Sequence, residues 1–194
     1  GRIGRMVLRS IIENNRKDIQ VVHINNKSSS EISSFLLAND TVHGKLKLKT
    51  ELSWTEHSIH FNKKVIQMTR ETEISKIDWQ RYGVDVVLEC TGKFNTVEKS
   101  SKHINAGAKK VIVSAPCKGA KNIVFGVNEK DLKSKDKVIS AASCTTNCLA
   151  PVAHVLNEEF GIERGFMTTI HSYTTDQRLL DNSHKDLRRA RSAP

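Results

Sequence analysis

The chain has few cysteines, few aromatic residues and no long apolar run. Its four cysteines among 194 residues lack paired Cys-x-x-Cys spacing, which argues against a zinc ribbon or a disulfide framework. No apolar stretch approaches the roughly 18–20 residues that a membrane-spanning helix needs. No basic and apolar leader with a small-residue cleavage site opens the chain, so nothing in it predicts secretion. These absences favour a cytoplasmic protein without a membrane or metal site.

Basic residues are in excess, because 31 Lys and Arg stand against 21 Asp and Glu, a formal balance of +10. The excess is spread from Lys17 to Lys185, and aromatic residues make up only 5% of the chain. Nucleic-acid-binding faces are typically concentrated stripes with aromatic residues interleaved. The charge therefore fits a solvated surface, or binding of a phosphorylated small molecule, better than a nucleic-acid face. Recruitment of RNA by a non-catalytic basic domain stays open as an alternative.

Hydrophobic periodicity predicts alternating helices and strands along the chain. Apolar residues at helical spacing, with polar caps, predict helices after Gly4 and over 28–37, 95–106 and 146–160. Short apolar runs predict buried strands at 19–24, 84–88, 110–113, 123–127, 138–140 and 165–173. Period-two alternation within 44–69, with a turn near 62–64, predicts an antiparallel excursion.

This order of elements predicts an α/β fold with a doubly wound parallel sheet. A domain boundary is expected near Ser143, so the predicted domains are residues 1–143 and 144–194. Ligands of such sheets bind at the carboxyl ends of the strands. Asn25, Thr91 and Ser114 each follow a predicted strand and are therefore candidates for that edge.

Gly1-Arg2-Ile3-Gly4 precedes a predicted helix and resembles the end of a dinucleotide-binding glycine fingerprint. In such a fingerprint the glycines permit a tight turn, and the amides at the helix start bind the pyrophosphate. Two glycines at this spacing are also common in ordinary loops before helices. The predicted strand that follows about 20 residues later, as in a dinucleotide fold, favours the binding interpretation.

The segment Ala142–Cys148 places small and hydroxyl residues around Cys144 at the expected start of a helix. Exposed N–H groups and the helix dipole at such a point favour a thiolate. A nucleophilic cysteine also needs a base, and His171, at the end of the next predicted strand, is the candidate. A buried structural cysteine is the alternative. Cys148, one helical turn later, is not expected to bridge to Cys144 without distortion.

The basic run 184–191 fits either an exposed charged face or a phosphate-binding site. Arginine guanidinium groups match phosphate oxygens in pairs, so one arginine of the run could hold a phosphorylated substrate. Thr174, Thr175 and Asp176 lie just upstream and add hydroxyl groups close to His171 in the sequence.

The block Ser143–Pro151 resembles the active-site signature of the phosphorylating glyceraldehyde-3-phosphate dehydrogenases, bacterial members included. Further segments match the family in the same order: Gly1–Arg5, Thr91–Gly92, Ser114–Pro116, Gly126–Asn128 and Thr168–Thr174. The resemblance covers the whole chain and implies a Rossmann-type dinucleotide-binding domain followed by the start of an α+β catalytic domain. It also implies that the first strand and most of the catalytic domain are missing, so this chain alone is expected to be inactive.

The resemblance assigns the chemistry to Cys144 and His171. Cys144 would attack D-glyceraldehyde 3-phosphate, and His171 would raise its thiolate character and accept the hydroxyl proton of the thiohemiacetal. Hydride transfer to the nicotinamide of NAD would leave a thioester, which inorganic phosphate would cleave to 1,3-bisphosphoglycerate. Erythrose-4-phosphate dehydrogenase, a relative with the same thiol chemistry, is the alternative activity.

The binding roles implied by the resemblance fall into two sets. The implied cofactor residues are Arg2, Ile3, Asn26, Arg70, Thr91, Ser114 and Ser183. The implied residues for the attacking phosphate and the substrate phosphate are Ser143, Thr145, Thr174, Asp176 and Arg189. Members of the family are usually homotetramers, in which Ser183 would act across a subunit interface.

Two positions depart from the pattern of NAD-specific members. Asn26 stands where the family usually has an aspartate that binds the adenosine ribose, and a carboxylate there would repel a 2′-phosphate. Ser183 stands where NAD-type bacterial members commonly have a proline, and NADP-using plastid members have serine. Lys27 and Ser28–Ser30 could also contact a 2′-phosphate. The sequence therefore predicts relaxed use of NAD and NADP.

Overall fold

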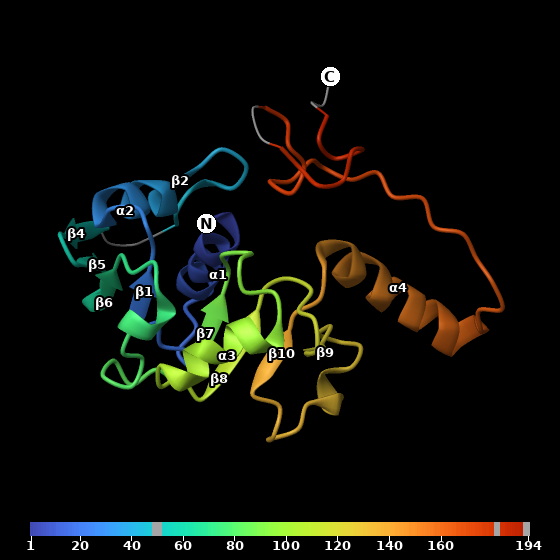
Figure 1. Ribbon diagram of the computed structural model, residues 1–194, viewed down its shortest axis with the longest axis horizontal. Helices are drawn as coiled ribbons and strands as arrows, with labels where there is room; N and C mark the ends of the chain where they lie inside the picture. Colours follow the sequence, from blue (N-terminus) through green and yellow to red (C-terminus); the bar gives the residue numbers. More distant parts are fainter. Residues whose placement is uncertain (48–51, 181–182, 192–194) are drawn as a thin grey trace. The chain divides into compact units, whose positions relative to one another are not determined.

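The computed structural model describes residues 1–47, 52–180 and 183–191 (Figure 1). The chain divides into two compact units, Gly1–Val155 and Leu156–Pro194. Every strand among the described residues lies in the first unit. Residues 48–51, which belong to the predicted antiparallel excursion, lie outside the described residues.

Side-chain caps start two of the helices. Ser29 Oγ accepts the Ile32 N–H at 3.2 Å before α2, and Thr96 Oγ1 accepts the Lys99 N–H at 3.2 Å before α3. Each cap satisfies one of the amides that a helix start leaves without an intrahelical acceptor. The helices are α1 (Arg2–Glu13), α2 (Ser30–Ala38), α3 (Val97–Asn105) and α4 (Cys144–Phe160), with short 3₁₀ turns η1 (Ile74–Lys76) and η2 (Glu129–Asp131).

The strands form two four-stranded sheets and one small hairpin. The first sheet has the order β1 (His23–Asn25), β6 (Lys64–Thr69), β5 (Ser58–Phe61), β4 (Ser53–Thr55). The second has the order β7 (Val86–Glu89), β8 (Lys110–Val113), β10 (Val138–Ser140), β9 (Lys121–Asn122). All pairs of the second sheet are parallel, as is β1 with β6, whereas β4, β5 and β6 pair antiparallel. The doubly wound fold is thereby confirmed, together with the antiparallel excursion.

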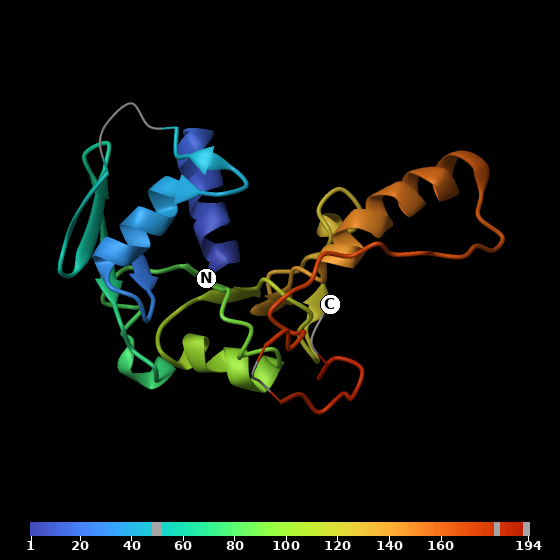
Figure 2. The ribbon, with the colours of Figure 1, turned by 90° about the horizontal axis from the view of Figure 1, so that it is seen from above.

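Helices cover both faces of the strands. Figure 2 shows α1 and α2 on one side of the strands and α3 on the other. Two buried clusters fill the layers. One cluster gathers around Val111, which has no exposed surface, with Trp79 and Val113 beside it, and the other joins Leu8 and Leu37 to the fully buried Ile66. Burying one such aliphatic side chain contributes about 1.5–3 kcal/mol relative to leaving it exposed.

A buried arginine joins α1 to the hairpin of β2 (Asn39–Asp40) and β3 (Gly44–Lys45). Arg9 is only 3% exposed. Its guanidinium donates to the Gly44 carbonyl at 2.8 Å, to the Lys45 carbonyl at 3.2 Å and to Glu13 Oε1 at 2.9 Å. A charge taken out of water needs such partners to remain ionised at acceptable cost.

Two predicted strands are wrong. The expected strand 123–127 is replaced by the shorter β9 and a turn, in which Asn128 Oδ1 accepts the Val124 N–H at 2.8 Å and Gly126 takes a φ of +79°. Such a positive φ favours glycine and cannot continue a strand. Residues 165–173 form no strand either, because no described segment supplies the neighbouring ladder that an extended chain needs. Of the strand predicted at 19–24, only the last two residues form a strand, as part of β1.

The second unit begins in the last turn of α4 and continues as turns and extended chain over its described residues. Residues 161–177 are all exposed. Among the described residues of the whole chain, no helix combines the length and the apolar character needed to cross a bilayer.

Candidate active site

The carboxyl edge of the second sheet carries several of the predicted site residues. Strands β7, β8 and β10 run parallel, so their carboxyl ends meet at one edge of the sheet. Thr91 follows β7 by two residues, Ser114 follows β8 directly, and Ser143 comes three residues after β10. The Ser114 N–H donates to the Glu89 carbonyl at 3.0 Å, which ties the ends of β7 and β8 together. The parallel register therefore brings Thr91, Ser114 and Ser143 to the same edge.

Asn26 and Arg70 follow the parallel strands β1 and β6 of the first sheet. The Asn26 N–H donates to the Thr69 carbonyl at 3.0 Å, so the two strand ends are joined next to both residues. The side-chain amide of Asn26 donates to Ser33 Oγ at 3.0 Å, and Arg70 is exposed. The neighbouring Asn25 holds the chain after β6 by accepting the Glu71 N–H at 2.8 Å.

The start of α1 lies beside the end of β7. A Cβ built on Gly4 would lie 3.6 Å from Cys90 Cβ, and one built on Gly1 would lie 3.9 Å from the Cys90 carbonyl oxygen. Gly1 is the N-cap residue and offers no side-chain acceptor to the first turn. The first amides of this turn therefore have no side-chain cap, and at a helix start the dipole favours an anion. Arg2 and Ile3 are exposed there.

Arg2 has a partner that the sequence pattern did not reveal. Its guanidinium donates to both carboxylate oxygens of Asp40, at 2.8 and 3.1 Å. Asp40 Oδ1 also accepts the N–H groups of Val42 and His43, at 3.0 and 2.9 Å. The hydrogen bonds from Arg2, followed by those from the backbone, hold the pKa of the Asp40 carboxyl well below its usual range. Asp40 therefore orients Arg2, and only the close approach of the β2–β3 hairpin to α1 could have identified it.

A strained turn presents Cys144 at the start of α4. Ala142, directly before the turn, has a φ of +57°, a left-handed conformation that side chains other than glycine rarely adopt. Ser143 Oγ then accepts the Thr146 N–H at 3.0 Å, as a helix cap does. The Asn147 side chain reaches back to the carbonyl groups of Ala141 and Ser143, at 2.8 and 2.9 Å. Such strain is characteristic of functional sites, because only the surrounding structure can maintain it.

Cys144 is the first residue of α4 and is exposed in this chain. Its role as a nucleophile, against the alternative of a structural cysteine, stays a prediction. Helix-start amides at this position favour a thiolate over a thiol. The other cysteines differ. Burial raises the pKa of the Cys90 thiol and of the Cys117 thiol, which disfavours their reactive form. Cys148 is exposed one turn further along the helix.

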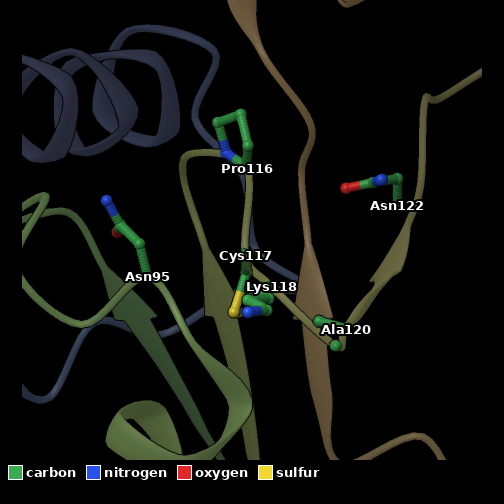
Figure 3. A pocket seen from close by; sticks show the side chains of 7 residues that line it. Asn95, Pro116, Cys117, Lys118, Ala120 and Asn122 are labelled. Atoms are coloured by element: carbon green, nitrogen blue, oxygen red, sulfur yellow. The ribbon is translucent and has the colours of Figure 1, made fainter. Parts of the chain in front are cut away.

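A cavity of about 430 Å³ lies at the same edge, beyond Ser114. It is lined by the loop after β8, including Pro116, Cys117 and Lys118, and by Asn95 from the segment before α3 (Figure 3). Asn95 Oδ1 is buried and has no hydrogen-bond partner among the described residues. The volume lies within the range of small-molecule sites, roughly 300–1,000 Å³.

Thr145 is the second residue of α4, in the first unit, and the other predicted site residues lie in the second unit. Thr174 begins a turn that ends at Gln177. The Thr174 carbonyl accepts the Gln177 N–H at 3.0 Å, and the Thr174 N–H donates to Gln177 Oε1 at 3.1 Å. The guanidinium of Arg189 forms an ion pair with Asp176, so the structure brings these two residues together. His171 and Ser183 are exposed. Cys144 and His171 belong to different units, and their pairing stays a prediction.

Comparisons with known proteins agree with the geometry. Residues 1–97 match the family model described as the glyceraldehyde 3-phosphate dehydrogenase NAD binding domain, and residues 143–194 match the C-terminal domain of the same family. The whole chain aligns with glyceraldehyde-3-phosphate dehydrogenases of Thermotoga maritima and Geobacillus stearothermophilus, each 50% identical, and of Zymomonas mobilis, 48% identical. It covers 58%, 57% and 57% of these relatives, respectively.

The parallel sheet, the capless helix start beside it and the residues at its carboxyl edge define an α/β protein of the dinucleotide-binding class. The family model extends over half of the chain, and relatives that are half identical align with all of it. The chain belongs to the glyceraldehyde-3-phosphate dehydrogenase family, and it spans a little over half the length of the curated relatives described above. The family resemblance of the sequence is thereby confirmed.

Proposed function

We propose that the full-length protein converts D-glyceraldehyde 3-phosphate, NAD and inorganic phosphate into 1,3-bisphosphoglycerate, NADH and a proton. One observation carries the proposal. An exposed cysteine begins a helix, directly after a strained turn, at the ligand-binding edge of a sheet from this family. A cysteine in this position has its thiolate stabilised by the helix start and is open to a substrate carbonyl.

The residues of the first unit fit a dinucleotide. The uncapped first turn of α1 offers N–H groups to the pyrophosphate, and Arg2 adds a cation that Asp40 orients. Asn26 and Arg70 flank the adenosine end, while Thr91 and Ser114 lie at the other sheet, on the nicotinamide side. When bound, NAD accepts the hydride that leaves the substrate carbon.

Cys144 and His171 carry the covalent steps in this proposal. The Cys144 thiolate attacks the aldehyde carbon, a C–S bond forms, and the carbonyl oxygen takes a proton from the protonated His171 to become the hydroxyl of a thiohemiacetal. His171 takes the proton of that hydroxyl as the carbon is oxidised to the thioester. An oxygen of inorganic phosphate then attacks the thioester carbon, the C–S bond breaks, and the acyl phosphate leaves while Cys144 returns to the thiolate.

Two sets of hydrogen-bonding groups serve the phosphates. Ser143 and Thr145 flank the nucleophile and bind the attacking phosphate. Thr174 and Arg189 hold the phosphate of the substrate, where the planar guanidinium can donate two hydrogen bonds at once. Asp176 already pairs with Arg189 and keeps the guanidinium beside the turn that Thr174 begins.

We further propose that the protein accepts NADP as well as NAD. The neutral amide of Asn26 follows β1, and Lys27 and Ser28 come next, so no carboxylate at this position repels a 2′-phosphate. The kcat/KM of the full-length protein for the two cofactors tests this idea, and an NAD preference above about a thousandfold would end it. Asn26→Asp should raise the preference for NAD about tenfold, since a new carboxylate opposes the 2′-phosphate.

We also propose that the full-length protein works in the cytoplasm as a homotetramer, in which Ser183 faces the cofactor of a neighbouring subunit. Family membership supports this arrangement, and the exposure of Ser183 is compatible with it. Light scattering of the full-length protein measures the subunit number, and a monomer at assay concentration would contradict the proposal.

The decisive test compares two cysteines one helical turn apart. In the full-length protein, Cys144→Ala should lower kcat at least about a thousandfold, because the covalent route is lost. Cys148→Ala is the matched control and should change kcat less than about threefold. Formation of NADH is followed by absorbance, with erythrose 4-phosphate as a second substrate. Equal loss in both variants, or higher kcat/KM for the four-carbon aldehyde, would overturn the assignment.

Selective alkylation supplies a readout that does not need turnover. Brief treatment with iodoacetamide near neutral pH, followed by mass spectrometry, should label Cys144 well before the other three cysteines. The thiolate is the species that reacts, and burial favours the thiol at the partly buried Cys90 and the buried Cys117. Uniform labelling, or none at Cys144, would count against an activated thiolate.

A further inference from the structure

A buried carboxylate at the end of β7 is outside the chemistry described above. Glu89 is the last residue of β7 and is only 4% exposed. Its Oε2 accepts a hydrogen bond from His103 Nε2 at 3.0 Å, and its Oε1 accepts the Thr91 N–H at 2.7 Å. Both oxygens are therefore occupied by donors, one from α3 and one from the turn that follows the strand.

The tautomer of His103 follows from its second partner. The indole Nε1 of Trp79 donates to His103 Nδ1 at 3.1 Å, and an indole nitrogen can only donate. Nδ1 must therefore be the acceptor, so the ring proton sits on Nε2 and points at Glu89. His103 is neutral in this arrangement, and Glu89 is the ionised group. Burial alone would raise the pKa of the Glu89 carboxyl, but hydrogen bonds from His103 and Thr91 outweigh it and hold the pKa below its usual value.

The carboxylate fixes the first amide of the turn 91–95. Gly92 then takes a φ of +72°, and its carbonyl accepts the Asn95 side-chain amide at 2.9 Å. Thr91 Oγ1 accepts the Lys93 N–H at 3.1 Å. With the Thr91 N–H directed inward to Glu89, the turn has a single orientation relative to β7.

We propose that Glu89 is a positioning residue for dinucleotide binding, acting through the Thr91 turn. The inference rests on the proposed function, in which Thr91 lies on the nicotinamide side of the cofactor. An ionised carboxylate is the group that suits this place, because it accepts from two donors at once. The Trp79 N–H donates to His103, and the His103 N–H donates to Glu89. Each hydrogen therefore has one acceptor, and this arrangement keeps the Glu89 carboxylate ionised.

The amide variant tests the hydrogen-bond chain. In Glu89→Gln, one carboxamide oxygen faces two donors, Thr91 N–H and His103 Nε2–H, and the carboxamide NH₂ must oppose one of them. His103 cannot relieve this clash of donors by moving its proton to Nδ1, because Nδ1 would then oppose the Trp79 N–H. We expect the Kd for NAD of the full-length protein to rise about tenfold, with the KM for the aldehyde within about twofold of the wild type.

A second substitution should rescue the first. Trp79→Phe removes the indole donor, so His103 can carry its proton on Nδ1 and accept through Nε2 from the carboxamide that Glu89→Gln introduces. In the double variant Trp79→Phe/Glu89→Gln, the Kd for NAD should return to within about threefold of that of Trp79→Phe alone. Glu98→Gln on the exposed first turn of α3 is the control, with an unchanged Kd.

Fluorescence titration with NAD and a thermal melt on each variant separate the outcomes. A Glu89→Gln variant that melts earlier but binds NAD like the wild type would show a structural role only and overturn the inference. A double variant that fails to fold, or that binds as weakly as Glu89→Gln, would overturn it as well. If the wild type itself bound no NAD, the proposed function would fail. If Glu89→Gln alone does not fold, a double variant that folds and binds supports the inference.

Discussion

The two units position their predicted site residues by different means. In Gly1–Val155, side chains such as Thr91 and Ser114 are positioned by parallel strands, whose register fixes where each strand ends. In the second unit, Thr174 and Arg189 are held by a turn and by an ion pair on an exposed segment. The comparison teaches that strand ends can be predicted from the hydrophobic pattern, whereas the hydrophobic pattern does not predict which polar side chains will pair with one another.

The largest expected effect is on the free energy of unfolding, where a buried isoleucine of the first unit is compared with an exposed isoleucine of the second. Ile66 is 0% exposed and Ile170 is 101% exposed. In this 194-residue chain, Ile66→Ala should lower the free energy of unfolding by about 2–5 kcal/mol, through lost transfer energy and a cavity. Ile170→Ala should change it by less than about 0.5 kcal/mol. Urea unfolding followed by circular dichroism measures both, and comparable losses would abolish the contrast.

The next prediction tests whether one arginine of the basic run in the second unit binds the substrate phosphate. In the full-length protein, Arg189→Ala should lower kcat/KM for the aldehyde about 10- to 100-fold, since charge-assisted hydrogen bonds to phosphate contribute about 1.5–3 kcal/mol. Arg188→Ala, its exposed neighbour, should cost less than about threefold. Steady-state kinetics at saturating cofactor separate the two variants. Equal losses of kcat/KM in the two variants would mean that the ion pair with Asp176 does not make Arg189 the specific phosphate-binding arginine.

The sequence predicted the first unit well, because its signals are local. The helices expected over 28–37 and 95–106 and the turn expected near 62–64 follow from patterns a few residues long. The start of α4 at Cys144 was predicted within two residues, since small and hydroxyl residues mark a helix start. The end of the strand predicted at 19–24 lies one residue before the observed end of β1 at Asn25, because the apolar run of that strand stops there.

Some of the features that were not predicted depend on contacts between segments distant in the sequence. The pairing of Arg2 with Asp40 joins residues 38 positions apart, and the Glu89–His103–Trp79 chain links β7, α3 and the turn that contains Trp79. The turn at Gly126 replaces an expected strand because Asn128 supplies a side-chain acceptor to its backbone. Apolar residues alone also predicted a strand at 165–173, where no described segment offers a ladder.

A smaller effect concerns pH and the first unit. Burial lowers the pKa of His23 to about 4, while an unfolded histidine titrates near 6.5. Between these values the unfolded chain binds more protons than the folded chain, so stability present above pH 6.5 is lost as the pH falls toward 4. We expect a loss of about 1–2 kcal/mol, after allowing for solvent screening of the half-buried ring. Urea unfolding at several pH values measures it.

The control for this pH effect is His23→Phe, which retains a ring against Tyr82 and removes the titrating group. The variant should lose that part of the pH dependence. A wild type and a variant with the same slope between pH 6.5 and 4 would show that His23 does not contribute.

The smallest effect examines the strained turn before Cys144. Ala142→Gly should leave the free energy of unfolding within about 0.5 kcal/mol of the wild type, because relief of the left-handed strain offsets the entropy that glycine adds to the unfolded chain. Ala141→Gly has no such strain to relieve and should cost about 0.5–1 kcal/mol. A larger loss at Ala142 than at Ala141 would contradict the role of strain.

The buried Arg9 has a kinetic consequence for the start of α1. Its guanidinium holds carbonyl groups of the β2–β3 hairpin, and that hairpin in turn supplies the Asp40 carboxylate to Arg2. Helix and hairpin should therefore open as a single cooperative unit, and their amide protons should exchange with deuterated solvent at one shared rate. Ligand bound at the helix start would then slow exchange in the hairpin as well, although the hairpin need not touch that ligand.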